Sequence, residues 1–195
     1  MSELDLITAV YAGRHEQVLL HLKGRDDAVK HFLIVSAALA AASQAEVIGI
    51  NALLAIPVVA LGMAVSFGFH HVYIGVIVCF LRYDLAKRVP EDVPFPEWDR
   101  SSAHGESVLP LRFVTLVGGG VVFVVVTLLS VWFYAISDTS YDRAGGVLAA
   151  YALIMAVLAG GTVAVFGTWR YEIEKEAKNK SLAPISETPA SQGGR

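Results

Sequence analysis

The sequence predicts an all-α fold: a polytopic membrane protein with a four-transmembrane-helix bundle and an amphipathic cytosolic helix at its N-terminus. The first observation is composition, since the 195 residues are 55% hydrophobic and 17% charged, with a mean hydropathy of +0.56. A soluble domain of this length is usually far more polar. The second observation is that three long runs contain no Asp, Glu, Lys or Arg. The third is that Lys and Arg gather on one side of the predicted spans.

The longest uncharged run covers 32 residues, from 50 to 81. As a helix it would measure about 48 Å, whereas the hydrocarbon core of a bilayer is about 30 Å thick. This helix must therefore cross the bilayer and protrude from it. Polarity returns at His70 and His71 and continues through Arg82, so we expect a stem in the headgroup layer or in water. Pro57 lacks a backbone N–H to donate, and we expect a kink there.

The N-terminal segment, 1–30, is predicted to be an amphipathic helix whose apolar stripe is interrupted by Arg14 and Arg25. Such a helix can lie on the headgroups, pack on the stem, or pair with another subunit. Because no Pro or Gly-rich break follows, we expect it to run straight into a weak, alanine-rich first span at about 31–45. The small profile of this span favours a place inside the bundle. Residues 31–85 then form the first transmembrane hairpin with its cytosolic stem.

Residues 86–112 are predicted to be a cytosolic loop in which four prolines forbid a continuous helix. These prolines are Pro90, Pro94, Pro96 and Pro110. The uncharged runs 113–137 and 144–169 each match one tilted span, and the short connection between them predicts a second transmembrane hairpin over 113–169. The tail, 170–195, is expected to be cytosolic and disordered, since its last part is rich in Ser, Pro and Gly.

Aromatic and basic residues set the expected position in the membrane. Trp132 and Tyr134 near one face, with Trp169 and Tyr171 near the other, occupy positions typical of an aromatic belt. Of the 15 Lys and Arg residues, 14 flank the spans on one side and one lies on the other. The positive-inside rule assigns the basic side to the cytoplasm. We therefore expect a multi-pass protein of the plasma (inner) membrane with both termini cytoplasmic and the lipid bilayer as its surroundings.

Small residues recur at three- and four-residue spacing in the last two spans. Such residues let helix backbones approach closely, which is how membrane helices associate. Packing within the hairpin is the favoured explanation, and an interface between subunits is the other. The candidate packing positions are Gly119, Ala149, Ala156, Gly160 and Ala164.

The adjacent histidines His70 and His71 are candidate functional residues, because an ionisable side chain deep in a bilayer indicates a proton relay or a ligand site. Their place near the end of the span favours an interfacial role, with one packed and one solvated. Neighbouring side chains point about 100° apart on a helix, so the two cannot share one metal unaided. No helical spacing links them to His15 or His21, and we expect no metal site.

Three polar residues at the opposite end are the other candidates: Glu46, Gln44 and Asn51. They could bind a cation at the outer mouth of the bundle, although a glutamate at a helix end that snorkels to the surface is the commoner case.

Soluble catalysis and nucleic-acid binding find no support in the sequence. Phosphate-binding, serine-hydrolase and zinc-protease motifs are absent. The net charge of -3 does not suggest a nucleic-acid partner. A single cysteine, Cys79, excludes an intrachain disulfide. The polar first thirty residues lack the pattern of a removable signal peptide. We expect no cofactor.

A set of short motifs lies between Arg14 and Asp99. These are Arg14 and Arg25, Ile56-Pro57 with Ala60-Leu61-Gly62, His70-His71 with Ile74-Gly75, Leu81-Arg82 with Asp84-Leu85, and Trp98-Asp99. In these positions the chain resembles a group of small, uncharacterised bacterial four-span membrane proteins. The resemblance covers less than half of the chain, and the last two spans match only in being apolar. The group has no agreed activity, so the resemblance implies architecture and bacterial origin and assigns no residue a role.

The favoured hypothesis is a non-enzymatic membrane protein that forms homo-oligomers and contacts a cytosolic protein partner or signal. One version is a membrane-perturbing effector that opens or oligomerises when its cytosolic part is engaged. The alternative is a channel or transporter subunit for an ion or small molecule that uses Glu46, Gln44 and Asn51. A membrane enzyme that uses the histidines ranks last, because no acid, base and nucleophile converge at one depth.

Overall fold

The computed structural model describes residues 3–89, 102–137 and 145–182, and this part of the chain is helical, without strands. It therefore confirms the all-α prediction. The elements, in chain order, are α1 (Glu3–Gln44), the 3-10 helix η1 (Ile50–Ala55), α2 (Ile56–Cys79), the π-helical turn η2 (Phe80–Leu85), the 3-10 helix η3 (Ala86–Arg88), α4 (Ser102–Ser137) and α5 (Gly145–Leu182).

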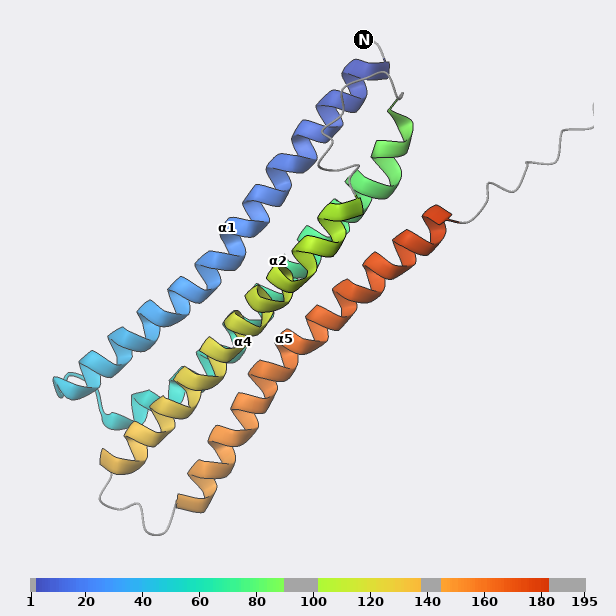
Figure 1. Ribbon diagram of the computed structural model, residues 1–195. Helices are drawn as coiled ribbons and strands as arrows, with labels where there is room; N and C mark the ends of the chain where they lie inside the picture. Colours follow the sequence, from blue (N-terminus) through green and yellow to red (C-terminus); the bar gives the residue numbers. More distant parts are fainter. Residues whose placement is uncertain (1–2, 90–101, 138–144, 183–195) are drawn as a thin grey trace, which may run out of the picture.

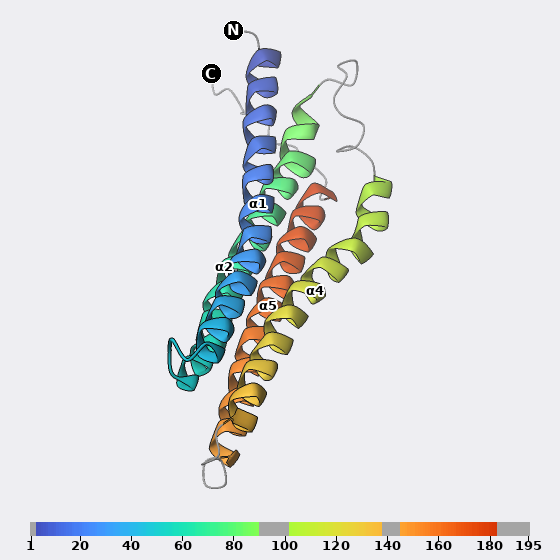
Figure 2. The same cartoon turned by 90° about the vertical axis from the view of Figure 1, so that its left-hand side faces the viewer.

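Four long helices lie side by side and alternate in direction along the chain (Figures 1 and 2). Helices α1 and α4 run one way, and α2 and α5 run the other. As a result the start of α1, the end of η3, the start of α4 and the end of α5 share one end of the molecule, which we call the basic end. The turn after α1, the end of α4 and the start of α5 lie at the opposite end.

Three helical segments are long and apolar enough to cross a membrane: Ile50–Arg88, Leu116–Ile136 and Val147–Ser181. Their outward faces carry large apolar side chains, including Trp132, Leu153 and Val157, each more than half exposed. Contiguous apolar surface of this kind is unfavourable in water and suits lipid. The chain is thus a helical membrane protein, and α1 is not among the three segments.

Helix α1 is continuous over 42 residues, as expected from the absence of a break after residue 30. The expectation that its second half lies inside the bundle is wrong. Leu33, Ile34 and Val35 are exposed, and α1 packs mainly on α2 through Ala28 and Phe32. The central position belongs to α2, which contacts α1, α4 and α5. Two of these contacts are close because a glycine faces the neighbour: Gly68 and Gly75 of α2 face α5, and Gly24 of α1 faces α2.

Two apolar clusters hold the helices together. In the membrane-level core, the ring of Phe123 lies 5.1 Å from that of Phe32 and 6.1 Å from that of Phe67. This layer joins α1, α2 and α4. The second cluster lies at the basic end, where Ile7 of α1 packs with residues of α2, η2 and η3 and the segment that follows. The other buried members of that cluster are Ile77, Leu81, Leu85 and Val89.

The N-terminal helix was expected to lie on the headgroups, to pack on the stem, or to pair with another subunit. The second cluster shows that the first half of α1 packs on the stem, and the Arg14 guanidinium lies 5.5 Å from the centre of the Phe80 ring. The stem itself, predicted as a plain helical extension, changes to π-helical and then 3-10 geometry. We call α1 up to Lys30, the stem from Ile77 to Val89 and α5 after Trp169 the basic-end extension.

Three expectations about helix limits need correction. Pro57 causes no kink within an α-helix, because α2 begins at Ile56 and the proline occupies its first turn, where no N–H is required. Helix α4 begins at Ser102, so the expected loop is helical over 102–112, including Pro110. Helix α5 ends at Leu182, so the expected disordered tail is helical over 170–182. The predicted turn at 138–143 and the last part of the tail lie outside the described residues.

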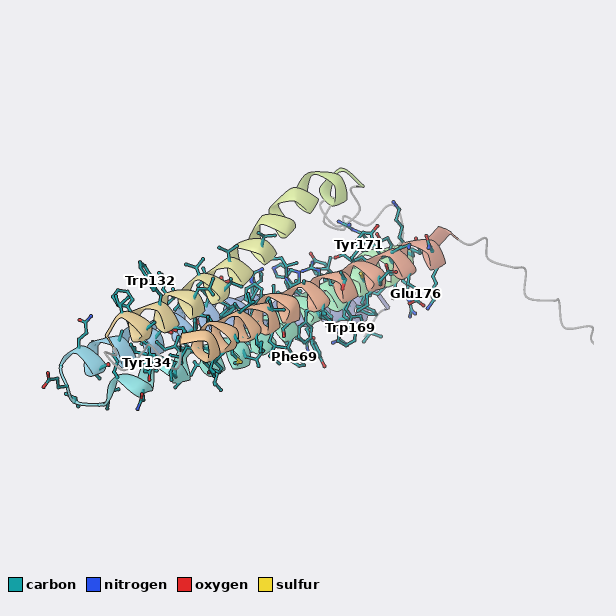
Figure 3. The ribbon with its side chains drawn as sticks, turned by 90° about the horizontal axis from the view of Figure 1, so that it is seen from below. Phe69, Trp132, Tyr134, Trp169, Tyr171 and Glu176 are labelled. Atoms are coloured by element: carbon teal, nitrogen blue, oxygen red, sulfur yellow. The ribbon has the colours of Figure 1, made fainter. Side chains whose placement is uncertain are left out.

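The aromatic belt is present only in part. Trp132 lies near one end and Trp169 and Tyr171 lie toward the other (Figure 3), and all three are more than half exposed. Tyr134 is instead buried, at 8% exposure, because its hydroxyl donates a hydrogen bond to Asn51 Oδ1 at 3.0 Å.

The turn between α1 and η1 has the hydrogen bonds of a Schellman motif. The Val47 N–H donates to the Ala42 carbonyl at 3.0 Å, and the Glu46 N–H donates to the Ser43 carbonyl at 3.2 Å. Glu46 occupies the left-handed position with φ of 56°, where glycine is the usual residue. Its exposed side chain therefore sits at a strained cap.

Replacement of this residue by glycine should stabilise the protein. Removal of Cβ relieves the left-handed strain, and we expect Glu46→Gly to gain about 1 kcal/mol, measured by thermal unfolding in detergent. Glu46→Ala keeps Cβ and should gain nothing. If Glu46→Ala stabilises the protein as much as Glu46→Gly, the carboxylate and not the backbone is responsible, and this account of the turn is wrong.

Candidate functional site

The adjacent histidines of α2 point to different neighbours. His70 contacts α1, where its Nδ1 lies 2.9 Å from Nδ1 of His21. His71 is buried at 3% exposure and contacts Arg170 of α5. This divergence follows from the 100° step of a helix, as predicted. Together the side chains of His21, His70, His71 and Arg170 form a polar layer across three helices, which we call the boundary layer.

The His21–His70 contact depends on a glycine. A Cβ on Gly24 would lie 2.6 Å from His70 Cε1, so only glycine lets the imidazole lie against the α1 backbone. Tyr73 stacks on His21 with ring centres 5.1 Å apart, which fixes the plane of that ring. An N–H···N hydrogen bond requires one nitrogen to donate and the other to accept, so the bonded pair shares a single proton at this position.

The second half of the boundary layer buries a cation. The Arg170 residue is 6% exposed, and its Nη1 donates to the His71 carbonyl oxygen at 3.3 Å. Its Nε donates to Glu174 Oε1 at 3.1 Å, one turn further along α5. The stem of the side chain lies over Gly75, where a Cβ would be 2.7 Å from Arg170 Cγ. A guanidinium buried at this level is costly unless it is paired in this way.

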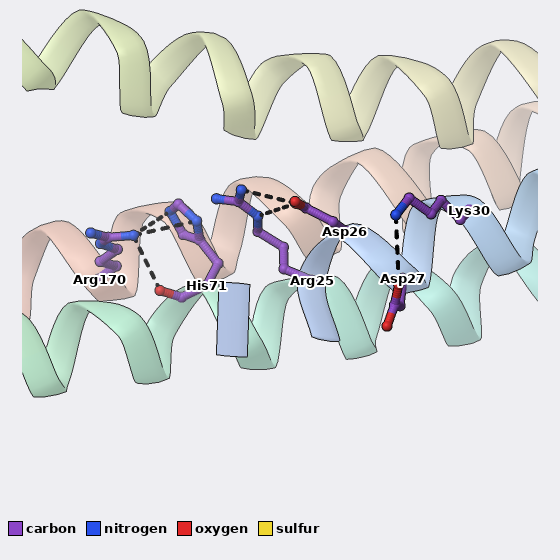
Figure 4. Close-up of polar contacts among 6 residues, drawn as sticks. All are labelled: Arg25, Asp26, Asp27, Lys30, His71 and Arg170. Atoms are coloured by element: carbon purple, nitrogen blue, oxygen red, sulfur yellow. Dashed lines mark hydrogen bonds and ion pairs between the residues drawn. The ribbon is translucent and has the colours of Figure 1, made fainter. Parts of the chain in front are cut away.

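Ion pairs on α1 run alongside the boundary layer (Figure 4). Arg25 pairs with Asp26 at 3.0 Å, and Lys30 pairs with Asp27 at 3.8 Å. Their acidic members are partly or largely exposed, so each pair contributes at most about 1 kcal/mol. Arg25, predicted to interrupt an apolar stripe, has only 15% of its side chain exposed.

The candidates at the opposite end do not converge. Gln44 and Glu46 are exposed on the turn. Asn51 accepts the hydrogen bond from Tyr134, and Tyr151 donates to the Leu54 carbonyl at 2.8 Å. These contacts anchor η1 to α4 and α5. The polar groups at this end thus serve the turn and its attachment.

The candidate packing residues divide into two groups. Gly119 is buried against the Phe67 ring, Ala156 is 4% exposed, and Gly160 faces Val124 of α4. The Gly160 contact fits packing within the hairpin of α4 and α5, whereas Gly119 packs against α2 of the other hairpin. Ala149 and Ala164 are exposed, so the prediction that they pack between helices of the monomer is wrong. The inward face of α5 is instead completed by Ala152, Ala159 and Val163.

Sequence reasoning missed His21 and Arg170 as members of this layer. His21 could have been paired with His70 by folding the chain about the turn at 45–49, since positions equally far from a turn face each other in an antiparallel hairpin. The sequence gives less indication that Arg170 belongs to this layer. It directly follows the uncharged run 144–169, where a basic residue is expected to lie in water. Its burial depends on Gly75, which belongs to another hairpin.

Within the described residues, no group of three or more His, Cys, Asp or Glu side chains could hold a metal ion. Cys79 is buried. Comparisons of the chain with protein-family models, with curated proteins and with solved structures found no match.

Removal of the buried Arg170 guanidinium should lower the free energy of unfolding. Arg170→Ala removes the partner of His71 and Glu174 and leaves a void over Gly75, so we expect a loss of about 3 kcal/mol in unfolding free energy. Lys175→Ala is the matched control, because Lys175 forms an exposed pair with Glu172 at 3.8 Å on the same helix. That variant should lose less than about 1 kcal/mol. The free energy of unfolding is measured by denaturant titration in detergent. Equal losses in the two variants would show that the contacts of Arg170 do not stabilise the fold more than an exposed ion pair does.

Proposed function

We propose that this chain is a non-enzymatic, four-span protein of the bacterial inner membrane that self-associates and presents its basic end to a cytosolic partner. The observation that supports this most is the basic-end extension. In this extension α1 and the stem share a buried cluster of their own, and the end of α5 is joined to the stem by the Lys87–Ser181 hydrogen bond. A simple membrane anchor would not need such a structure.

The extension is attached to the spans at several points. The His21–His70 bond joins α1 to α2, and Arg170 joins α5 to α2. Lys87 of η3 donates to the Ser181 carbonyl of α5 at 2.9 Å. These contacts connect all three parts of the extension to one another and to α2, which is the physical connection that a signal from a bound partner would need.

The orientation of the protein is part of the proposal. Of the 15 basic residues, 14 lie in the sequence segments 1–31, 82–112 and 170–195 and one lies in 138–143, which favours a cytosolic location for both termini. The second half of α1 is the proposed fourth span. Its exposed apolar residues Leu33, Ile34 and Val35 support contact with lipid.

Self-association is proposed through the outward face of α5. Ala149, Gly161 and Ala164 are exposed there beside large apolar residues such as Val157. A Cβ on Gly161 would meet nothing within 4 Å, so this glycine has no packing role within one chain. Small exposed residues allow the close approach of a second helix. In the version that we favour, a partner at the basic end changes this association and so perturbs the membrane.

The channel or transporter alternative has no particular observation in its favour. The aromatic layer of Phe32, Phe67 and Phe123 fills the centre of the described helices, each ring being at most 2% exposed. Glu46, Gln44 and Asn51 are accounted for by the turn and its attachment.

A leucine at Gly161 should weaken self-association without harming the monomer. Because the site is open, Gly161→Leu should fold normally, and we expect about a tenfold higher dissociation constant, equivalent to about 1.4 kcal/mol. The measurement is subunit counting by single-molecule photobleaching in bilayers over a range of protein densities. Gly62→Leu is the control, since Gly62 is also an exposed glycine with no atom within 4 Å of a built Cβ. A wild-type protein that stays monomeric at every density would refute the proposed association.

A further inference from the structure

A groove opens between the stem and the last turns of α5. Its volume is about 500 Å³, which is within the range of small-ligand sites. Ile173 and Ala177 supply its apolar part, and Tyr83 lies on the stem side. The groove is formed entirely by residues of the basic-end extension.

Five charged side chains line this groove. Lys87 and Arg88 come from η3 and Lys180 comes from α5, whereas Asp84 and Glu176 are the acidic members. The lining therefore carries one excess positive charge.

The ammonium groups of the groove retain unused donors. Lys87 donates one hydrogen bond to the Ser181 carbonyl, and Lys180 pairs with Glu176 at 2.7 Å. Each ammonium has three N–H groups, so both can also bind an anion. Arg82, in the same turn as Asp84, has its Nε and Nη2 buried with no hydrogen-bond partner among the described residues, which adds to the positive potential nearby.

The depth of the groove indicates what an anion there would be. Ile173 lies four residues past Trp169, about 6 Å along the helix. The polar layer of a bilayer begins at the level of such aromatic residues and extends several ångströms further. The groove continues along α5 to Lys180, eleven residues or about 16 Å past Trp169, so its inner end is level with the lipid headgroups and its outer end lies beyond them. Cytoplasmic leaflets are rich in anionic lipids, and basic pockets on that side bind their headgroups.

We propose that the groove between η2, η3 and the end of α5 binds the phosphate of an acidic phospholipid headgroup, with Lys87, Arg88 and Lys180 as its cationic contacts. Occupation by a lipid would bridge the stem to α5, beside the Lys87–Ser181 contact. The inference rests on the orientation proposed above for its choice of leaflet. Lipid binding is measured in detergent, where the orientation of the protein plays no part. The binding proposal and the proposed orientation can therefore be refuted separately.

The test is binding of short-chain phosphatidylglycerol to the purified full chain in detergent at low salt, by thermophoresis. Short-chain phosphatidylcholine serves as the zwitterionic comparison, and glycerol phosphate serves as the free phosphate. Phosphatidylglycerol should bind at least fivefold more tightly than either, and the preference should shrink at high salt because the charges are screened. Equal affinity for the two lipids would overturn the site, and equal affinity for glycerol phosphate would overturn the assignment to a lipid.

Variants of opposite sign locate the site. Arg88→Gln should weaken phosphatidylglycerol binding about fivefold, the typical effect of one basic residue near an anionic surface. Glu176→Gln should strengthen it, because it removes a competing anion and frees Lys180. Lys178→Gln is the matched control: it changes net charge as Arg88→Gln does, and it lies on α5 outside the groove. If Lys178→Gln weakens binding as much as Arg88→Gln, or Glu176→Gln has no effect, the groove is not the binding site.

Discussion

The whole arrangement depends on close approach to helix backbones at glycine. A built Cβ on Gly68 would overlap the Phe166 side chain of α5, and one on Gly75 would meet Arg170. On α1, Gly24 makes room for His70 in the same way. A membrane gives helices no hydrophobic reason to associate, so dispersion contacts at short range and buried hydrogen bonds must hold them together. The glycines of α2 permit both with α5.

The boundary layer is a consequence of that close packing. The Arg170 side chain is buried over Gly75, and its contacts with His71 offset part of the cost of removing it from water. The layer separates the apolar spans from an extension that has its own buried cluster. A buried polar network has few alternative arrangements, so it fixes the register of α1, α2 and α5 at this level.

Local signals in the sequence predicted much of this fold. The uncharged runs and basic segments gave the helical class and the two hairpins, and the lack of a break after residue 30 gave a continuous α1. The wrong predictions concern residues whose surroundings are set by another helix. Tyr134 looked like a belt residue until Asn51 was seen beside it, and Ala149 and Ala164 share the spacing of Ala156 but face outward. Periodicity identifies faces of a helix, but it does not say which face meets a neighbour. The left-handed backbone conformation of Glu46 could not be predicted either, because a glutamate does not indicate a left-handed helix cap.

The most direct measurement compares alanine at two glycines of α2. In Gly68→Ala the new methyl group would overlap the Phe166 ring near its attachment to the backbone, so α5 must move. The account predicts a loss of about 1–3 kcal/mol in unfolding free energy, by denaturant titration in detergent. Gly62→Ala adds the same group in open space and should be neutral or stabilising by up to about 1 kcal/mol. If both variants are equally stable, or Gly62→Ala is the more damaging, the helices do not meet α2 at its glycines and the account is contradicted.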